Sequence, residues 1–169
     1  MTQMRHEDLR LITGAGRFTA DWNLENQCHM AVVRSPHAHA KLLQVDTSAA
    51  QHAAGVVMVV TAADVTAAHY ASLPSGPEIT GVQGAVIRKG VMPVLAIDRV
   101  RFSGQPVAVV IAETALQAQD ACELVNVTYE TLPAVVDVHK ATDPLAQSIH
   151  PGVENNRSLI FESGDRKAV

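Results

Sequence analysis

A continuous apolar run near the middle of the chain organises the predicted fold. Residues 107–112 (VAVVIA) show no alternation of apolar and polar positions, which is typical of a strand covered on both faces. Ser103 and Gly104 separate this run from the short segment 100–102, and a two-residue connection with glycine in second place favours a hairpin turn. The pattern therefore predicts a β-hairpin whose second strand lies at the centre of a sheet.

The residues after this strand follow helical spacing. Thr114 and Gln117 form a Thr-x-x-Gln capping box, which is typical of a helix start. Four residues at spacings i, i+3, i+4 and i+7 form an apolar face: Ala118, Ala121, Cys122 and Val125. We expect this face to lie on the sheet. A half-exposed strand follows over 127–130, where apolar and polar residues alternate, and Leu132-Pro133 ends it.

Similar patterns upstream predict three more strands and two short helices. The strands cover 27–34, 41–45 and 56–60, and the last is a second uninterrupted apolar run that we expect to be buried. One helix covers 48–54 and ends at Gly55 in the left-handed conformation. A second helix starts from Thr61 or Asp64. Together these elements predict an α+β fold built on a mixed β-sheet with two or three short helices.

Two kinds of segment without regular pattern surround this predicted domain, which covers 22–138. Residues 1–21 are mostly polar and predict an N-terminal arm, whereas 139–169 have little apolar periodicity and predict a linker. Inside the domain, residues 71–93 hold three prolines and four glycines, with 86–87 as a candidate short strand. Loops of this length in compact domains are usually functional or contact a partner. The last apolar cluster, 159–161, has no partner element after it, which favours a piece of a longer polypeptide.

Composition and charge exclude several classes of protein. The chain of 169 residues is 47% apolar, enough for one soluble domain with extra segments. Its formal charge of −4 and the lack of clustered Lys and Arg exclude a nucleic-acid surface. No apolar stretch approaches the ~20 residues that a membrane span needs. The first ten residues carry charges where a signal peptide needs its hydrophobic segment, so we expect a cytoplasmic protein.

The two cysteines give no sign of a disulfide framework. Cys28 and Cys122 are too few and too far apart for such a framework or for a CxxC metal site. Cys28 falls in a predicted strand and Cys122 on the apolar face of a predicted helix. We therefore expect both to be small buried hydrophobic residues, and a disulfide between them is the alternative.

The histidines are the strongest candidates for chemistry. His37 and His39 stand two apart in the segment SPHAHA and would share a face if that segment is extended. Such a pair is half of a zinc site, and zinc needs three or four ligands. No further pair at helix or hairpin spacing completes the set, so the sequence assigns no metal site, and hydrogen-bonded turn histidines are the preferred interpretation. His29, Asp137 and His139 would complete a site only through an unforeseen fold.

Other candidate sites are weaker still. Ser35, Ser103 and Cys122 lie in no nucleophile elbow and beside no evident base. Gly14 and Gly16 lack the third glycine, the preceding strand and the following helix of a phosphate-binding loop, which favours a turn. The acidic residues are spread singly, without the close pair that acid/base work uses. The residues alone therefore predict neither a catalytic residue nor a cofactor-binding residue in this chain.

Five blocks of sequence, in this order and spacing, carry a resemblance to a known family. They are RHEDLRLITGAGRFTAD, VRSPHAHAKLLQVDTSAA, GVVMVVTAADV, LAIDRVRFSGQPVAVVIAET and DACELVNVTYETLPAVVD, which run from Arg5 to Asp137. The chain resembles the N-terminal α/β hammerhead domain of the large, molybdenum-binding subunit in the xanthine dehydrogenase, aldehyde oxidase and carbon monoxide dehydrogenase family. The residues at 104–108 (GQPVA) are most similar to those of the carbon monoxide dehydrogenase large-chain group.

The resemblance implies a molybdenum-dependent oxidoreductase as the parent protein. Such enzymes oxidise aldehydes, heterocycles or carbon monoxide at a molybdenum-pterin centre, and iron-sulfur clusters and FAD on other domains or subunits carry the electrons. The family's pterin-binding segments and catalytic base lie downstream of this domain, so none can be carried onto a residue here. The resemblance thus implies a structural domain that is inactive by itself, with 139–169 as the linker toward a molybdopterin-binding domain. The rest of the molybdenum subunit and the iron-sulfur and FAD subunits are the expected partners.

Two alternatives stay open on sequence alone. The chain would be a stand-alone metal-binding module if His37 and His39 gained further ligands. It would be a protein-interaction module if the domain acts outside an enzyme.

Overall fold

The computed structural model describes residues 5–73 and 76–164, so that 1–4 of the predicted arm and 165–169 of the predicted linker lie outside the described residues. Within these described ranges, six strands form two antiparallel three-stranded sheets. The first has the order β1 (His29–Arg34), β5 (Pro106–Ala112), β3 (Val56–Thr61), and the second has the order β4 (Arg99–Val100), β2 (Ala40–Asp46), β6 (Asn126–Thr131). The α+β class is confirmed, whereas the strand pairing is antiparallel throughout rather than mixed.

Strand β5 is the centre of the core, as the continuous apolar run predicts. Its side chains alternate between two buried clusters: Ala108 and Val110 belong to one, and Val107 belongs to the other. The hairpin prediction, by contrast, is wrong. Strand β4 pairs with β2, with Val100 opposite Ala40, and not with β5. The turn between β4 and β5 therefore passes the chain from one sheet to the other.

The amphipathic helix lies where its apolar face predicts. Helix α4 (Ala115–Glu123) begins at Thr114, whose Oγ1 accepts a hydrogen bond from the Gln117 N–H at 3.2 Å. Ala118 and Ala121 are fully buried against the first sheet, and this close approach depends on their small side chains. Gly55, which has a φ of +77°, lies directly beneath the Gln117 side chain. The predicted left-handed glycine is thus confirmed, and a Cβ at this position would have to displace the Gln117 amide.

The second apolar run forms the predicted strand but is less buried than expected. Strand β3 lies at the edge of its sheet and has a neighbour on one side only, and Val57 and Met58 are 59% and 54% exposed. The prediction of a buried strand is therefore wrong for these residues. The flanking helices, α2 (Ser48–Gln51) and α3 (Ala62–Ala67), are shorter than predicted. Asp64 caps α3 by accepting from Thr61 N at 2.7 Å.

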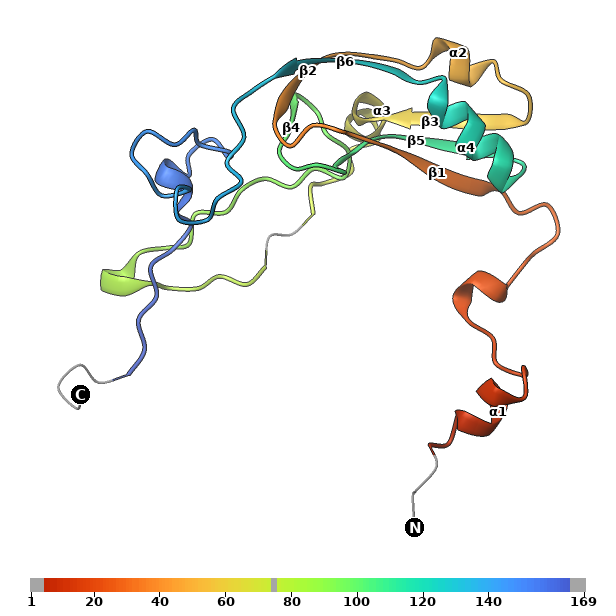
Figure 1. Cartoon of the computed structure of the whole chain (residues 1–169), viewed down its shortest axis with the longest axis horizontal. Helices are drawn as coiled ribbons and strands as arrows, with labels where there is room; N and C mark the ends of the chain where they lie inside the picture. The colour runs from red at the N-terminus through yellow and green to blue at the C-terminus, as the bar shows by residue number, and fades with distance from the viewer. Residues whose placement is uncertain (1–4, 74–75, 165–169) are drawn as a thin grey trace.

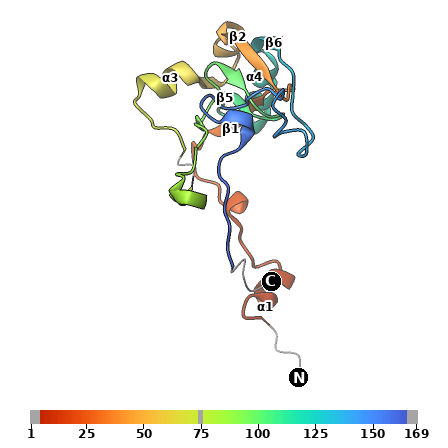
Figure 2. The same ribbon diagram turned by 90° about the vertical axis from the view of Figure 1, so that its left-hand side faces the viewer.

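Two extensions hang from the same side of this sheet core and give the molecule the outline of an arch (Figures 1 and 2). The first is the N-terminal arm, residues 5–27, with helix α1 (Asp8–Ile12) and the turn η1 (Thr19–Asp21). The second is the loop lobe, formed by residues 71–94 apart from 74–75 together with 134–164, with the turns η2 (Val82–Gly84) and η3 (Glu154–Asn156). Within the described ranges, no helix is long and apolar enough to cross a membrane.

Candidate interaction surface

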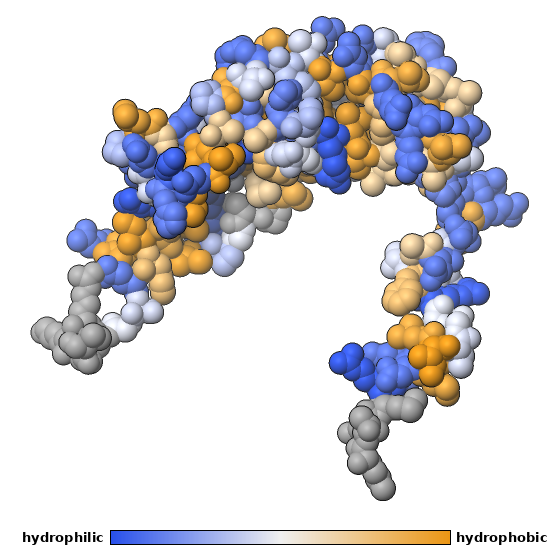
Figure 3. Space-filling view, in the orientation of Figure 1, coloured by the Kyte–Doolittle hydropathy of each residue, from blue (hydrophilic) through white to orange (hydrophobic). Residues whose placement is uncertain are grey.

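The N-terminal arm is ordered by local contacts alone. No residue of the arm is fully buried. Its turns close on themselves: the Asp21 carboxylate accepts from Phe18 N at 2.8 Å, and the Arg17 guanidinium lies 5.2 Å from the centre of the Trp22 ring. Six large apolar side chains are at least 40% exposed: Leu9, Leu11, Ile12, Phe18, Trp22 and Leu24. Figure 3 shows apolar atoms gathered along the arm. Such a chain of apolar groups outside the core is typical of a surface that packs on another protein.

The loop lobe is built from two segments that are far apart in the sequence and lie side by side. Val82 N donates to Ile160 O and Arg88 N donates to Ser158 O, both at 2.9 Å. The predicted linker thus forms backbone pairs with the long glycine-containing loop. The candidate strand at 86–87 is reduced to an isolated bridge between Thr80 and Val86.

Glycines make this close approach between the two segments feasible. A Cβ on Gly90 would stand 2.5–2.7 Å from atoms of the His150 ring, a separation that real Cβ atoms do not show. A Cβ on Gly81 would collide with the Ile160 carbonyl in the same way. Both positions therefore require glycine because of contact, since neither has a positive φ.

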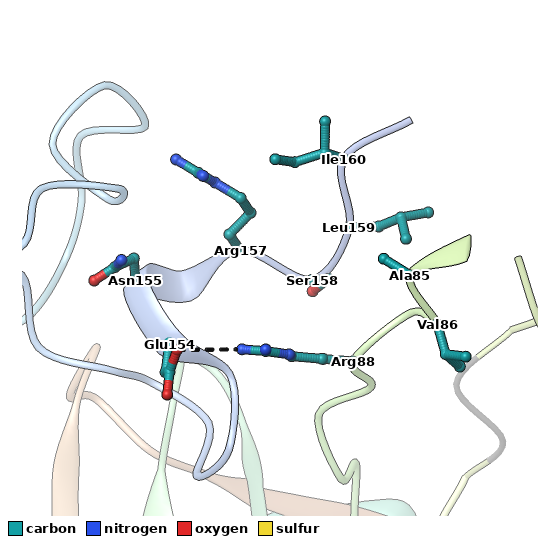
Figure 4. A pocket seen from close by; sticks show the side chains of 9 residues that line it. All are labelled: Ala85, Val86, Arg88, Glu154, Asn155, Arg157, Ser158, Leu159 and Ile160. Carbon is teal, nitrogen blue, oxygen red and sulfur yellow. Dashed lines mark hydrogen bonds and ion pairs between the residues drawn. The ribbon is translucent and has the colours of Figure 1, made fainter. Parts of the chain in front are cut away.

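An open hollow of about 240 Å³, lined by both polar and apolar residues, lies between the two segments of the lobe. Figure 4 shows Arg88 pointing across it toward Glu154, with Nη1 3.5 Å from the carboxylate oxygen, while Arg157 points away from this pair. Both members of the ion pair are more than half exposed, so the pair contributes little stability. We assign no ligand to this hollow.

Arg101 joins the loop lobe to the sheet core. Its side chain is 11% exposed, its Nε donates to Ile149 O at 3.2 Å, and its Nη1 donates to Arg99 O at 3.3 Å. Its backbone N–H donates to the side chain of Gln105, which is itself buried, at 2.6 Å. One residue therefore connects the turn before β5, the end of β4 and the lobe.

The charged groups around Arg101 have displaced pKa values. Burial tends to raise the pKa of the Asp98 carboxyl, but the hydrogen bond from Arg99 and the positive charge of Arg101 outweigh burial and hold this pKa below its ordinary value. Burial, followed by the charge of Arg101, lowers the pKa of His150. The imidazole of His150 is therefore neutral at pH 7, which suits a ring whose Nδ1 is buried without a hydrogen-bond partner.

The structure places His37 and His39 in different surroundings. The His37 ring meets the edge of Tyr129, with ring centres 4.8 Å apart. His39 is 1% exposed, its Nδ1 lies 2.8 Å from Pro133 O, and its Nε2 is buried without a partner. Across the described residues, no group of three or more His, Cys, Asp or Glu side chains is placed to hold a metal ion. The expectation that His37 and His39 form no metal site stays a prediction.

Ser35 joins SPHAHA to the turn before β5. Gly104 N donates to Ser35 O at 2.8 Å, and Ser35 N donates to Gln105 O at 3.0 Å. The Ser35 hydroxyl accepts from His37 N at 3.0 Å. Burial raises the pKa of Tyr129, and a hydrogen bond with Ser35 partly opposes this effect. Sequence reasoning missed this buried polar cluster, because the long-range pairing of two turns leaves no periodic signal.

The two cysteines differ from their common prediction. Cys122 is half-buried on α4, and burial raises the pKa of its thiol. Cys28 is exposed and lies just before β1, so the prediction that it is buried in a strand is wrong. The strand begins one residue later, at the end of the exposed arm.

Comparison with known proteins identifies similar domains and similar longer proteins. Residues 13–133 match the domain described as aldehyde oxidase and xanthine dehydrogenase, a/b hammerhead domain. The chain is 40% identical over 149 residues to the nicotine 6-hydroxylase large subunit of Paenarthrobacter nicotinovorans. This match covers 87% of the chain and 18% of that protein. It is 36% identical over 177 residues to the carbon monoxide dehydrogenase large chain of Afipia carboxidovorans, which covers 98% of this chain and 20% of that one.

A solved structure shows the same fold. The crystal structure of a Cu,Mo-CO dehydrogenase in its carbon monoxide reduced state superposes with a TM-score of 0.73 and 39% identity, over 86% of this chain and 17% of that one. The chain thus spans about a fifth of the length of the curated relatives it matches. The family profile covers most of the chain, from the end of α1 to the end of the second sheet. The chain therefore belongs to the α/β hammerhead domain family of aldehyde oxidases and xanthine dehydrogenases.

Proposed function

We propose that this chain is the structural N-terminal domain of the large subunit of a molybdenum-dependent oxidoreductase. One observation carries the proposal. This family domain spans about a fifth of its relatives, and it exposes large apolar side chains on an arm and a lobe outside its own core. These surfaces fit contact with the remainder of a larger protein. The parent would oxidise aldehydes, heterocycles or carbon monoxide at a molybdenum-pterin centre, passing electrons to iron-sulfur clusters and FAD on companion domains or subunits.

The described residues do not themselves fit the molybdenum group. The donor side chains of this domain are dispersed, without a set of three or more placed around one point in the described ranges. The buried polar residues Ser35 and Gln105 join turns, and His39 contacts Pro133 O through Nδ1, while its Nε2 has no partner. We therefore derive no chemical step through this domain, and we propose that it is not catalytic alone. A cytoplasmic location, expected from the charged first ten residues, stays a prediction.

The test compares the 169-residue chain with a polypeptide that also contains the sequence that follows it in the gene. Both are produced in a host that makes molybdenum cofactor, and molybdenum, zinc and iron are measured against protein. We expect no molybdenum in the 169-residue chain. We expect about one molybdenum per molecule of the longer polypeptide, provided that it contains the complete large subunit. Molybdenum in the isolated chain would place the cofactor site here and overturn the proposal.

The same measurement tests the alternative of a metal-binding module. Stoichiometric zinc in the isolated chain, lost on replacing His37 and His39 by alanine, would favour that function. The His52→Ala variant is the matched control, because His52 lies at the end of α2 and is not among the candidate metal ligands.

A further inference from the structure

A separate, mostly apolar cavity of about 200 Å³ lies where the loop lobe meets the turn before β5. Three parts of the chain form its walls. The first segment of the loop lobe contributes Val91 to Val94, the turn and the start of β5 contribute Phe102 and Pro106, and the second segment of the lobe contributes Ile149 and His150. Leu73 lies on its rim and is 52% exposed. Several of these side chains would be unfavourably hydrated if the cavity stayed open to water.

Hydrogen bonds hold each wall of this cavity in place. Leu73 N donates to Met92 O at 2.8 Å, and Ala96 N donates to Pro106 O at 2.9 Å. Arg101 Nε fixes Ile149 through its carbonyl, and the His150 ring is seated against Gly90. The cavity is therefore preformed rather than opened by its occupant.

Apart from His150, the polar side chains in these walls, Arg101 and Gln105, are engaged inside the chain. The side-chain oxygen of Gln105 accepts from Arg101 N, and the guanidinium of Arg101 bonds to main-chain carbonyls and to Asp98. His150 is held neutral, and its unpaired Nδ1 faces Gly90. A free metabolite is normally oriented by a few convergent polar groups, which this cavity does not offer. An apolar side chain that belongs to a neighbouring part of the protein needs no such polar groups. The contact between the two parts holds it near the cavity and gives it a high effective concentration.

We propose that this cavity, which we call the lobe socket, receives one apolar side chain of about the size of an aromatic ring from the remainder of the same polypeptide. A dry apolar cavity of about 150 Å³ holds one benzene molecule in a well-studied case, so the volume matches a single ring. The origin in the same polypeptide follows from the relatives, which are about five times longer than this chain, and from Ile149 and His150, which belong to the lobe. This inference rests on the proposed function.

The first arm of the test uses toluene as a probe on the 169-residue chain. Toluene is titrated while the methyl resonance of Met92 is followed by NMR. We expect saturable shifts of that methyl group. The Leu73→Trp variant places a large ring at the rim and is expected to weaken toluene binding at least about tenfold. Val86→Trp adds the same ring elsewhere on the lobe, where Val86 is 70% exposed, and is expected to leave binding unchanged. Absence of saturable binding to the unmodified chain would overturn the inference.

The second arm uses the longer polypeptide. We expect toluene no longer to shift Met92 there, because the anchoring side chain occupies the lobe socket, and we expect Leu73→Trp, but not Val86→Trp, to lower the yield of molybdenum-loaded protein. Unchanged toluene binding in the longer polypeptide would show that the socket is not filled from within the chain. Failure of the unmodified longer polypeptide to load molybdenum would instead contradict the proposed function and leave the toluene comparison intact as a separate result.

Discussion

The sheet core and the loop lobe are held together by different forces. Of the fully buried hydrophobic side chains in the described residues, Val153 alone belongs to the lobe, and the others lie in or beside the two sheets. The lobe depends instead on backbone pairs such as Val82 with Ile160 and on the amide of Asn156, which bonds to Ala141 O, Gln147 O and Ile149 N. Burial stabilises a structure without a partner, whereas exposed hydrogen bonds contribute little net stability. Of these two regions, the lobe is therefore the one whose order gains more from a partner.

The largest expected effect tests the core. Val110→Asp would place a carboxylate at a fully buried position of β5, in the core cluster that also contains Ala121 of α4. We expect a loss of more than about 4 kcal/mol in the free energy of unfolding, because a buried charge without a partner is strongly destabilising. Chemical denaturation followed by circular dichroism measures this loss. Val136→Asp makes the same change at a lobe residue that is 88% exposed, and we expect it to leave the midpoint within experimental error. Equal effects at the two positions would remove the distinction between core and lobe.

A middle-sized effect is expected inside the lobe. Gly90→Ala would bring a Cβ against the His150 ring, and overpacking of this kind costs about 1–3 kcal/mol where the neighbour cannot move away. Because the contact belongs to the lobe, we expect faster hydrogen exchange at Arg88 N, with the amides of β5 unchanged. Mass spectrometry of exchanged peptides resolves the two regions.

A double variant controls this prediction. In Gly90→Ala with His150→Ala the colliding ring is absent, and we expect exchange at Arg88 N to approach that of His150→Ala alone. If the second substitution gave no relief, the glycine requirement would have another cause.

The same difference explains which features the sequence predicts. Local rules predict β5, the cap at Thr114 and the left-handed Gly55, because each depends on neighbours in sequence or on continuous burial. The hairpin prediction fails because the partner of β4 is β2, a choice made by long-range contact around Val100. The turn-forming preference of Ser103 and Gly104 predicts the turn, but it does not predict which sheet contains the next strand.

The candidate surface was less predictable from sequence than the core. The length and composition of the loop over 71–93 predict a functional or contact role, and this loop forms one of the two segments of the lobe. Its partner segment, 148–160, shows no periodicity, and the pairing rests on glycines at 81 and 90 that resemble ordinary loop glycines in the sequence. The role of Arg101 was missed for the same reason, since its main partner, Ile149, is far away in the chain.

The smallest effect is a pH dependence confined to the lobe. Burial and the charge of Arg101 lower the pKa of His150 in the folded chain below its ordinary value of 6.5. The unfolded chain therefore binds the proton first, so the stability from the neutral ring is present above pH 6.5 and is lost as pH falls through the lowered folded pKa. Between pH 7 and pH 5 we expect hydrogen exchange at Ile149 and Arg88 to rise, after correction for intrinsic rates, while β5 stays protected. Asp98 stays ionised in this range, because its pKa is also lowered. His150→Asn cannot titrate, so persistence of the pH dependence in that variant would assign it to another group.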